Sequence, residues 1–164
     1  MNGRYFDQIA VLEKPGASNS NTFSGFAIMA IDCMIIETLQ QFYHGIDKTP
    51  QSQSIRSFHN FFRRSPKLNS FFTNYPKSKI FYKQIRCGLL HQAQTKNRSV
   101  IHIRKEPVLA WIDDTDFNQG ISIQRKHFHQ EILSVFKKYC SDLRNPNEIG
   151  LRAKFRTKMG FIVK

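Results

Sequence analysis

The chain has 164 residues, and its 25 Lys and Arg against 12 Asp and Glu give a formal net charge of +13 at pH 7. This length fits one domain, which buries roughly 70% of the surface that its unfolded chain exposes. Such a charge excess attracts polyanions and makes their binding depend on salt, so nucleic acid is the expected partner and a purely structural role is disfavoured.

The three cysteines are Cys33, Cys87 and Cys140. Their odd number and wide spacing match neither a disulfide framework nor a set of metal ligands. This pattern predicts a reduced, cytoplasmic protein, and neither a metal nor another cofactor is expected. The most apolar run, residues 26–36, is too short to span a bilayer, so we expect a soluble protein with no membrane partner.

Residues 1–22 are expected to form an N-terminal leader, with a short helix at 4–14 and then a loop of turn-forming residues. A long helix should begin at Thr22 or Ser24, either of which can cap its free amides, and stop at Gly45. Because the middle of this helix is apolar nearly all round, we expect it to be the central helix of a bundle.

Two carboxylates, Asp32 and Glu37, interrupt this apolar helix. A buried carboxylate is costly unless it is paired or hydrogen-bonded. Each is therefore either a structural or solvent-facing group, or a side chain that orients a functional group on a neighbouring helix.

Shorter helices are expected next. A loop at 47–53 precedes a helix that starts at Ser54 and ends at Ser65-Pro66, and the same pair can open a short third segment. Residues 78–95 then form a helix with one apolar stripe, made by Phe81, Ile85 and Leu89.

The pattern changes after this helix. Residues 99–103 and 108–112 are rich in β-branched and aromatic side chains, which predicts a β-hairpin, and 121–123 can add a third strand. The acidic run 113–116 lacks the spacing of a calcium loop, so we interpret it as a turn. Region 99–123 is thus expected to be a small β excursion.

The last long helix, 124–143, gives the clearest helical periodicity, with one apolar face formed by Phe128, Ile132, Val135, Phe136, Tyr139 and Leu143. Residues 146–164 form a basic tail. This tail is either disordered or a short amphipathic helix that docks through Leu151, Phe155 and Met159.

The helix expected at 78–95 contains two candidate catalytic residues, Arg86 and His91. Arg supplies a permanent cation whose planar guanidinium matches phosphate. His is the side chain whose proton moves near neutral pH. The pair therefore indicates phosphate chemistry.

The sequence around the pair, Tyr82-Lys83-Gln84-Ile85-Arg86-Cys87-Gly88-Leu89-Leu90-His91, together with the earlier run Ala30-Ile31-Asp32-Cys33-Met34-Ile35-Ile36-Glu37-Thr38-Leu39, resembles the HEPN family. These are small helical-bundle proteins of prokaryotic toxins, defence systems and RNA-processing factors, many of them metal-independent ribonucleases. The resemblance covers roughly residues 23–143. It implies a mainly α, HEPN-like bundle over 23–145 with a small β-hairpin excursion after the motif helix. One departure is Cys87, because many active members have Asn, Asp or His there.

Residues five apart on an ideal helix are separated by about 140° around the axis and about 7.5 Å along it. Arg86 and His91 therefore do not share a face. They can meet if the long Arg side chain wraps round, if Gly88 permits bending, or if the site is completed across a dimer. The resemblance implies a cleft between two such helices, so we expect a homodimer with a composite active site.

Basic side chains outside the motif are expected to hold the RNA backbone without reading its sequence. These are Arg63, Arg64, Lys137, Lys138, Arg152, Lys154, Arg156 and Lys158.

The expected function is metal-independent cleavage of single-stranded RNA by attack of the 2′-hydroxyl, with Arg86 and His91 as catalytic residues. The resemblance implies a toxin–antitoxin or antiphage defence setting, with an antitoxin or regulatory partner. One alternative is a catalytically silent HEPN-like module for RNA binding or assembly. Another is a basic DNA-binding protein, although no helix-turn-helix or zinc-finger spacing is present.

Overall fold

The computed structural model describes residues 1–13, 24–105 and 107–163. The loop expected at 15–21 and the capping candidate Thr22 lie outside the described residues. Within them the chain is mainly helical with a small three-stranded sheet, so the mainly α class is confirmed.

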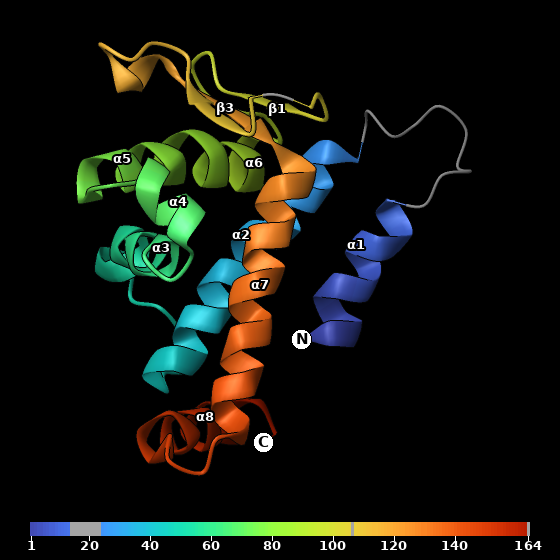
Figure 1. Cartoon of the computed structure of the whole chain (residues 1–164), viewed down its shortest axis with the longest axis vertical. Coiled ribbons are helices and arrows are strands. Elements are labelled where there is room, and N and C mark those ends of the chain that lie inside the picture. Colours follow the sequence, from blue (N-terminus) through green and yellow to red (C-terminus); the bar gives the residue numbers. More distant parts are fainter. Residues whose placement is uncertain (14–23, 106, 164) are drawn as a thin grey trace.

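Two long helices, α2 (Gly25–His44) and α7 (Arg125–Arg144), lie side by side through the middle of the molecule (Figure 1). The short helices α3 (Ser54–Phe62), α4 (Pro66–Phe71) and α5 (Tyr75–Phe81) flank them on one side. On the other side lies α1 (Asp7–Leu12), which follows the π-helical turn η1 (Asn2–Phe6). The sheet covers one end of the bundle, and α8 (Ile149–Ile162) covers the opposite end.

The central position of α2 follows from its sequence. Its apolar side chains are buried on almost every side, as predicted. The helix ends at Gly45, which has a left-handed backbone with φ 67°, a conformation that glycine adopts without strain. The cap expected of Ser24 is not formed, because the Ser24 hydroxyl accepts from Arg125 Nη1 at 3.1 Å instead.

By length and composition alone, α2 could cross a membrane, and no other helix among the described residues could. However, 56% of the relevant stretch is buried inside the fold. That burial is the pattern of a core helix in a soluble domain.

Three short helices carry the aromatic part of the core: α3 (Ser54–Phe62), which follows the turn η3 (Gln51–Gln53), α4 (Pro66–Phe71) and α5 (Tyr75–Phe81). The side chain of Ser65 accepts from the Leu68 amide at 3.3 Å, so this residue caps α4 as its position before Pro66 predicts. Phe62 stacks on Phe72 with ring centroids 4.2 Å apart. These rings are therefore core rather than platforms for bases.

The hairpin expected between 99–103 and 108–112 is wrong. Strands β1 (Val100–His102) and β2 (Leu109–Trp111) do not pair with each other, because β3 (Ile121–Gln124) lies between them. It runs parallel to β1 and antiparallel to β2. Burial explains the order: every residue of β3 is buried, whereas the other two strands are only partly covered and take the edges.

In the C-terminal part, the predicted apolar face of α7 is confirmed, and of the two alternatives for the tail the structure has the amphipathic helix. The apolar face of α7 lies in or against the core. The tail is the helix α8, and its side chains Leu151, Phe155 and Met159 pack on the core. Phe155 stacks on Phe42 at the end of α2, with ring centroids 5.6 Å apart.

Asp32 is completely buried and pairs with His129 of α7, with 2.7 Å between Oδ1 and Nδ1. Burial raises the pKa of Asp32 to about 6, although His129 opposes this shift. Burial alone would lower the pKa of His129, but the hydrogen bond and charge of Asp32, with a contribution from Glu13, raise it above 6.5. The pair thus joins the two central helices.

This pair predicts a pH-dependent stability. Both pKa values are raised on folding, so the Asp32 contribution to the free energy of unfolding declines as pH rises from 3.8 to about 6. The His129 contribution declines as pH rises through 6.5 and above. Chemical denaturation between about pH 5 and about pH 8 should show wild type losing stability relative to the double variant Asp32→Asn/His129→Gln. A constant difference would contradict this account.

Candidate functional site

The motif helix is continuous from Tyr75 to Gln92, but its middle is not α-helical. Between α5 and α6 (Cys87–Gln92), residues Tyr82–Arg86 form the π-helical turn η4. Its expected apolar stripe is buried, as predicted. Such π-turns are rare and occur frequently at functional sites.

Gln84 lies in the middle of this turn and is 5% exposed. Its backbone carbonyl accepts from the Lys96 amide at 2.9 Å, and its side-chain amide donates to the Asn118 carbonyl at 2.7 Å. Its side-chain oxygen accepts from the Ser99 hydroxyl, also at 2.7 Å. Gln84 therefore fixes the motif helix to two loops beside it. Sequence reasoning missed this residue, and its one signal is a polar side chain next to the apolar stripe.

Arg86 and His91 meet within one chain. Nη1 of Arg86 and Nε2 of His91 are 3.3 Å apart, on the exposed side of the helix. The residues between them belong to the α-helix α6, so the backbone keeps the α-helical separation, and the long Arg86 side chain bridges it. A second copy is therefore not needed to bring the two residues together, and the homodimer stays a prediction.

The contact with Arg86 requires one particular form of His91. A guanidinium only donates hydrogen bonds, so Nε2 of His91 must be the acceptor in a hydrogen bond with it. An imidazole that accepts through Nε2 carries its proton on Nδ1. His91 makes this contact as a hydrogen bond only in that form.

Glu37 of α2 holds the other side of the Arg86 guanidinium. Nε of Arg86 is 2.7 Å from Oε1, and Nη2 is 3.3 Å from Oε2, so the pair is bidentate. The guanidinium carbon also lies 5.3 Å from the centroid of the Tyr82 ring. Burial lowers the pKa of Arg86, but the hydrogen bond and charge of Glu37 outweigh it and raise the pKa, so Arg86 stays charged.

The structure gives different roles to Asp32 and Glu37, the two carboxylates whose roles the sequence did not decide. Glu37 contacts Arg86 and is placed to orient it. Asp32, one and a half turns earlier, points to His129 and contacts neither Arg86 nor His91. Its predicted role as an orienting carboxylate for the motif is wrong, and the structural interpretation holds.

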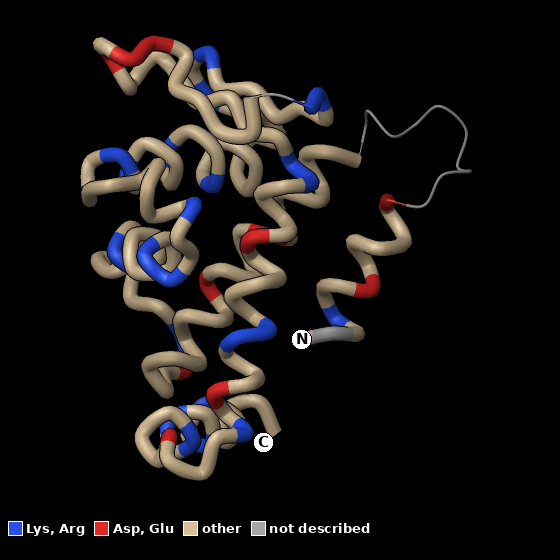
Figure 2. Tube along the Cα trace, in the orientation of Figure 1, with Lys and Arg blue, Asp and Glu red and all other residues tan. Residues whose placement is uncertain are grey.

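The basic residues proposed to grip RNA do not gather around the motif. Arg152, Lys154 and Arg156 lie on α8, at the end of the bundle away from the sheet (Figures 1 and 2). The positions on the long α7 helix are Lys137 and Lys138, and Lys138 pairs with Asp142 at 3.0 Å. Those that follow α3 are Arg63 and Arg64.

Besides Lys138, two more of these side chains have local structural contacts. The Arg64 guanidinium lies 3.5 Å from the centroid of the Tyr43 ring. Lys158 is 5% exposed and donates to the Asp47 carbonyl. The prediction that Lys158 contacts RNA is therefore wrong, because α8 turns this residue into the fold.

The acidic run at 113–116 is a turn, as interpreted. Oδ1 of Asp113 accepts from the Thr115 amide at 2.8 Å and from its hydroxyl at 2.6 Å. Asp116 accepts from the Asn118 amide and begins the turn η5 (Phe117–Gln119). In the described part of the chain, no group of three or more His, Cys, Asp or Glu side chains is arranged to hold a metal.

Comparison with known proteins gives no match to any family model, curated protein or solved structure. The resemblance to HEPN proteins thus stays a prediction from the motif residues. The helical fold and the contacts among Arg86, His91 and Glu37 are observed in the structure of this chain.

Gly88 predicts a first test of this region. A Cβ at Gly88 would collide with the Gln94 carbonyl and lie 3.3 Å from Lys96 Cγ, because the chain folds back against the helix after Ala93. Gly88→Ala should lower the free energy of unfolding by about 1–3 kcal/mol through overpacking. The measurement is urea denaturation followed by circular dichroism.

Gly160→Ala is the matched control. A Cβ at Gly160 meets nothing within 4 Å in the helix α8, so the change should be neutral or raise stability by up to about 1 kcal/mol. Equal effects of the two substitutions would contradict the close approach at Gly88.

Glu37→Gln tests the anchoring of Arg86. The Arg86 and Glu37 side chains are only 18% and 20% exposed, so loss of the charge should cost about 1–3 kcal/mol of unfolding free energy. It should also speed hydrogen exchange at Arg86 Nε, measured by NMR. The control is Asp142→Asn, which breaks a pair with a 71% exposed lysine and should cost less than about 1 kcal/mol. An unchanged Nε exchange rate would exclude the anchoring role.

Proposed function

We propose that this chain is a metal-independent endoribonuclease of HEPN type that cuts single-stranded RNA. The observation that supports it is the cluster of Arg86, His91 and Glu37, in which a fixed cation and an imidazole are in direct contact at the surface. The net charge of +13 favours the same substrate class. The HEPN resemblance suggests toxin–antitoxin or antiphage defence as the setting, with an antitoxin as regulatory partner.

In this proposal, Arg86 binds the phosphate at the cut. Glu37 occupies Nε and Nη2, which leaves Nη1 as the donor that can turn from His91 to a non-bridging phosphoryl oxygen. The guanidinium then stabilises the charge that gathers on these oxygens. Because Glu37 holds the other edge, the planar group stays oriented while it exchanges one partner.

The same exchange releases Nε2 of His91. This nitrogen can then accept the proton of the 2′-hydroxyl, whose oxygen attacks the phosphorus. The bond to the 5′-oxygen breaks, and that oxygen takes a proton from solvent. The products are a 2′,3′-cyclic phosphate and a 5′-hydroxyl. The resting hydrogen bond favours the base role for His91.

A second candidate is an RNA-binding or assembly module without catalysis. Cys87 favours it, because this half-buried thiol stands where many active HEPN proteins have Asn, Asp or His. It shares every feature with the enzyme except the chemistry of Arg86 and His91.

Cleavage assays separate the two candidates. His91→Ala should reduce the cleavage rate of single-stranded RNA by about 10²- to 10⁴-fold while RNA binding stays intact. Arg86→Lys should also lose most activity, because a point charge cannot keep both the Glu37 contact and the phosphate contact. The measurement is the rate of product formation in excess chelator, on RNA with and without a 2′-deoxy residue at the cut.

The matched controls are His44→Ala and Arg56→Lys, at two exposed positions away from the cluster, and both should cleave as wild type does. Cleavage that persists in His91→Ala, or that chelator abolishes, would contradict the mechanism. A wild-type protein that binds RNA but cuts none would support the silent module.

A further inference from the structure

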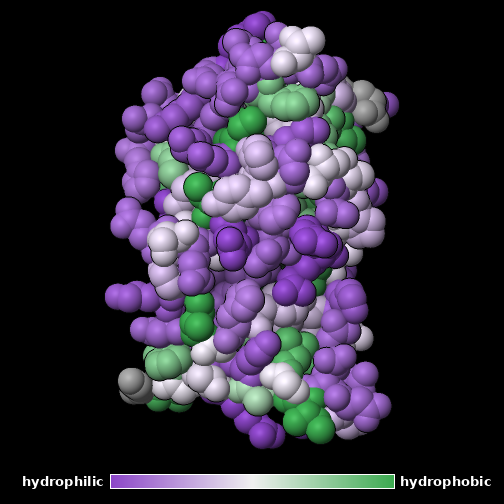
Figure 3. All heavy atoms as spheres, turned by 90° about the vertical axis from the view of Figure 1, so that its left-hand side faces the viewer, coloured by the Kyte–Doolittle hydropathy of each residue, from purple (hydrophilic) through white to green (hydrophobic). Residues whose placement is uncertain are grey.

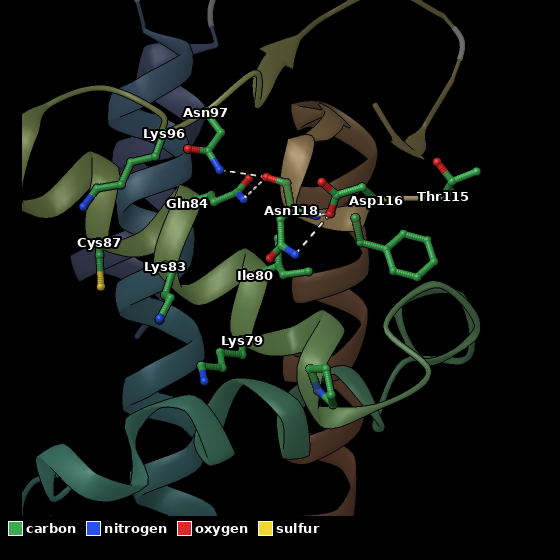
Figure 4. A pocket seen from close by; sticks show the side chains of 12 residues that line it. Lys79, Ile80, Lys83, Gln84, Cys87, Lys96, Asn97, Thr115, Asp116 and Asn118 are labelled. Atoms are coloured by element: carbon green, nitrogen blue, oxygen red, sulfur yellow. Dashed lines mark hydrogen bonds between the residues drawn. The ribbon is translucent and has the colours of Figure 1, made fainter. Parts of the chain in front are cut away.

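A groove of about 870 Å³ runs along the motif helix (Figure 4). One wall is the helix itself, from Pro76 to Cys87. The other wall is formed by Asn97 and the loop 115–118. The surface on the side of α3 and α5 is mainly hydrophilic (Figure 3), and the lining of the groove combines charged and amide side chains with Pro76, Ile80 and Phe117.

Three lysines line the groove. Lys79 and Lys83 are exposed and four residues apart, so they are one helical turn apart, about 6 Å along the axis. Lys96 packs beside Gly88, about one turn further along the helix. The three cations thus follow one wall of the groove along the motif helix.

These three cations have no competing anion of their own. None of the ion pairs within residues 1–13, 24–105 and 107–163 involves Lys79, Lys83 or Lys96. The one carboxylate that lines the groove, Asp116, accepts from Asn118 and from Gln119 Nε2, and these hydrogen bonds hold its pKa below the usual value. The groove therefore has an excess of two positive charges.

The opposite wall offers amides and a ring. Asn97 donates to the Asn118 carbonyl at 2.7 Å, and Asn118 donates to Asp116 at 3.1 Å, which fixes both amides at the rim. Lys77 lies 4.4 Å from the centroid of Phe117, the one aromatic side chain among the lining residues. Amides and an aromatic ring can contact the bases of a nucleic acid, and the lysines on the opposite wall can contact its phosphate backbone.

The groove reaches the beginning of α6, although neither Arg86 nor His91 is among its lining residues. Cys87 lines it and directly follows Arg86 in the helix. Gln84 lines it as well and fixes the helix to Lys96 and Asn118. A strand that leaves the groove at Cys87 would therefore pass next to the helical segment that carries Arg86 and His91.

We propose that this groove binds the single-stranded RNA segment next to the cut, with Lys79, Lys83 and Lys96 on its phosphates and Asn97 and Asn118 facing the bases. Its link to cleavage rests on the proposed function, but binding does not. This assigns the main RNA contact to side chains of the motif region rather than to α8.

The test measures binding of a fluorescent single-stranded RNA by anisotropy at several salt concentrations, with Lys79→Gln/Lys83→Gln/Lys96→Gln against wild type. The triple variant should bind at least about tenfold more weakly, and the slope of log affinity against log salt should flatten by about two, because each phosphate contact on a single strand contributes about 0.7. The control is Lys48→Gln/Lys105→Gln/Lys126→Gln, three exposed lysines outside the groove with the same change in charge. It should lose less than about threefold.

Equal losses in the two triple variants would overturn the groove and leave only diffuse attraction by net charge. Equal affinity of wild type for DNA of the same sequence would overturn the assignment to RNA. A triple variant that loses binding while wild type cuts no RNA supports the groove and refutes the enzyme. A triple variant that cuts RNA with wild-type kcat/KM supports the enzyme and refutes the groove.

Discussion

The bidentate ion pair between Arg86 and Glu37 is the interaction on which the candidate site depends. It joins the motif helix to the central helix α2 at one point, with 2.7 Å between Nε and Oε1. Both side chains are largely buried, so the guanidinium is oriented by the fold and not by solvent. Without Glu37, the partly buried charge of Arg86 would lack its carboxylate partner, and the guanidinium that contacts His91 would no longer be oriented.

The π-turn explains how the same helix serves both packing and chemistry. Phe81, Ile85 and Leu89 must face the core, while Arg86 must reach Glu37 and His91. The wider turn at 82–86 changes the angle between residues before and after it, and it leaves the Gln84 carbonyl to bind Lys96. The chain after the helix can then lie against Gly88, which has no side chain to prevent it.

The sequence was a good guide wherever one local pattern decided the structure. The apolar faces of α2, α7 and α8 and the caps at Gly45 and Ser65 all follow from residue type and spacing. It failed where a distant residue decided the outcome. Asp32 and Glu37 are both carboxylates on one apolar helix, and only the packing of α7 and the motif helix assigns one to His129 and the other to Arg86.

The sheet and the basic residues show the same limit. The central strand of the sheet is β3, the strand whose residues are all buried. The short apolar runs in the sequence do not show which of the three strands is buried in this way. Lys158 follows the basic pattern of the tail, but the docking of α8 turns it toward Asp47. Sequence spacing relates only Lys79 and Lys83, which are four residues apart on one helix. Lys96 lies near them only because the chain folds back against the helix at Gly88.

The contact between Arg86 and His91 has a consequence for how such a site would work. Nη1 of Arg86 and Nε2 of His91 contact each other, so neither atom is available to a ligand until the ligand replaces this contact. A phosphate can do so because it accepts from Nη1 more strongly than a neutral imidazole does, as a charged acceptor. The gain at the phosphate then offsets the loss of the internal hydrogen bond, and the base becomes available only when a phosphate is bound. RNA bound in the groove next to Cys87 would raise the local concentration of phosphate near Arg86 and His91. One helix would then carry both the residues that bind RNA and the residues that act on it.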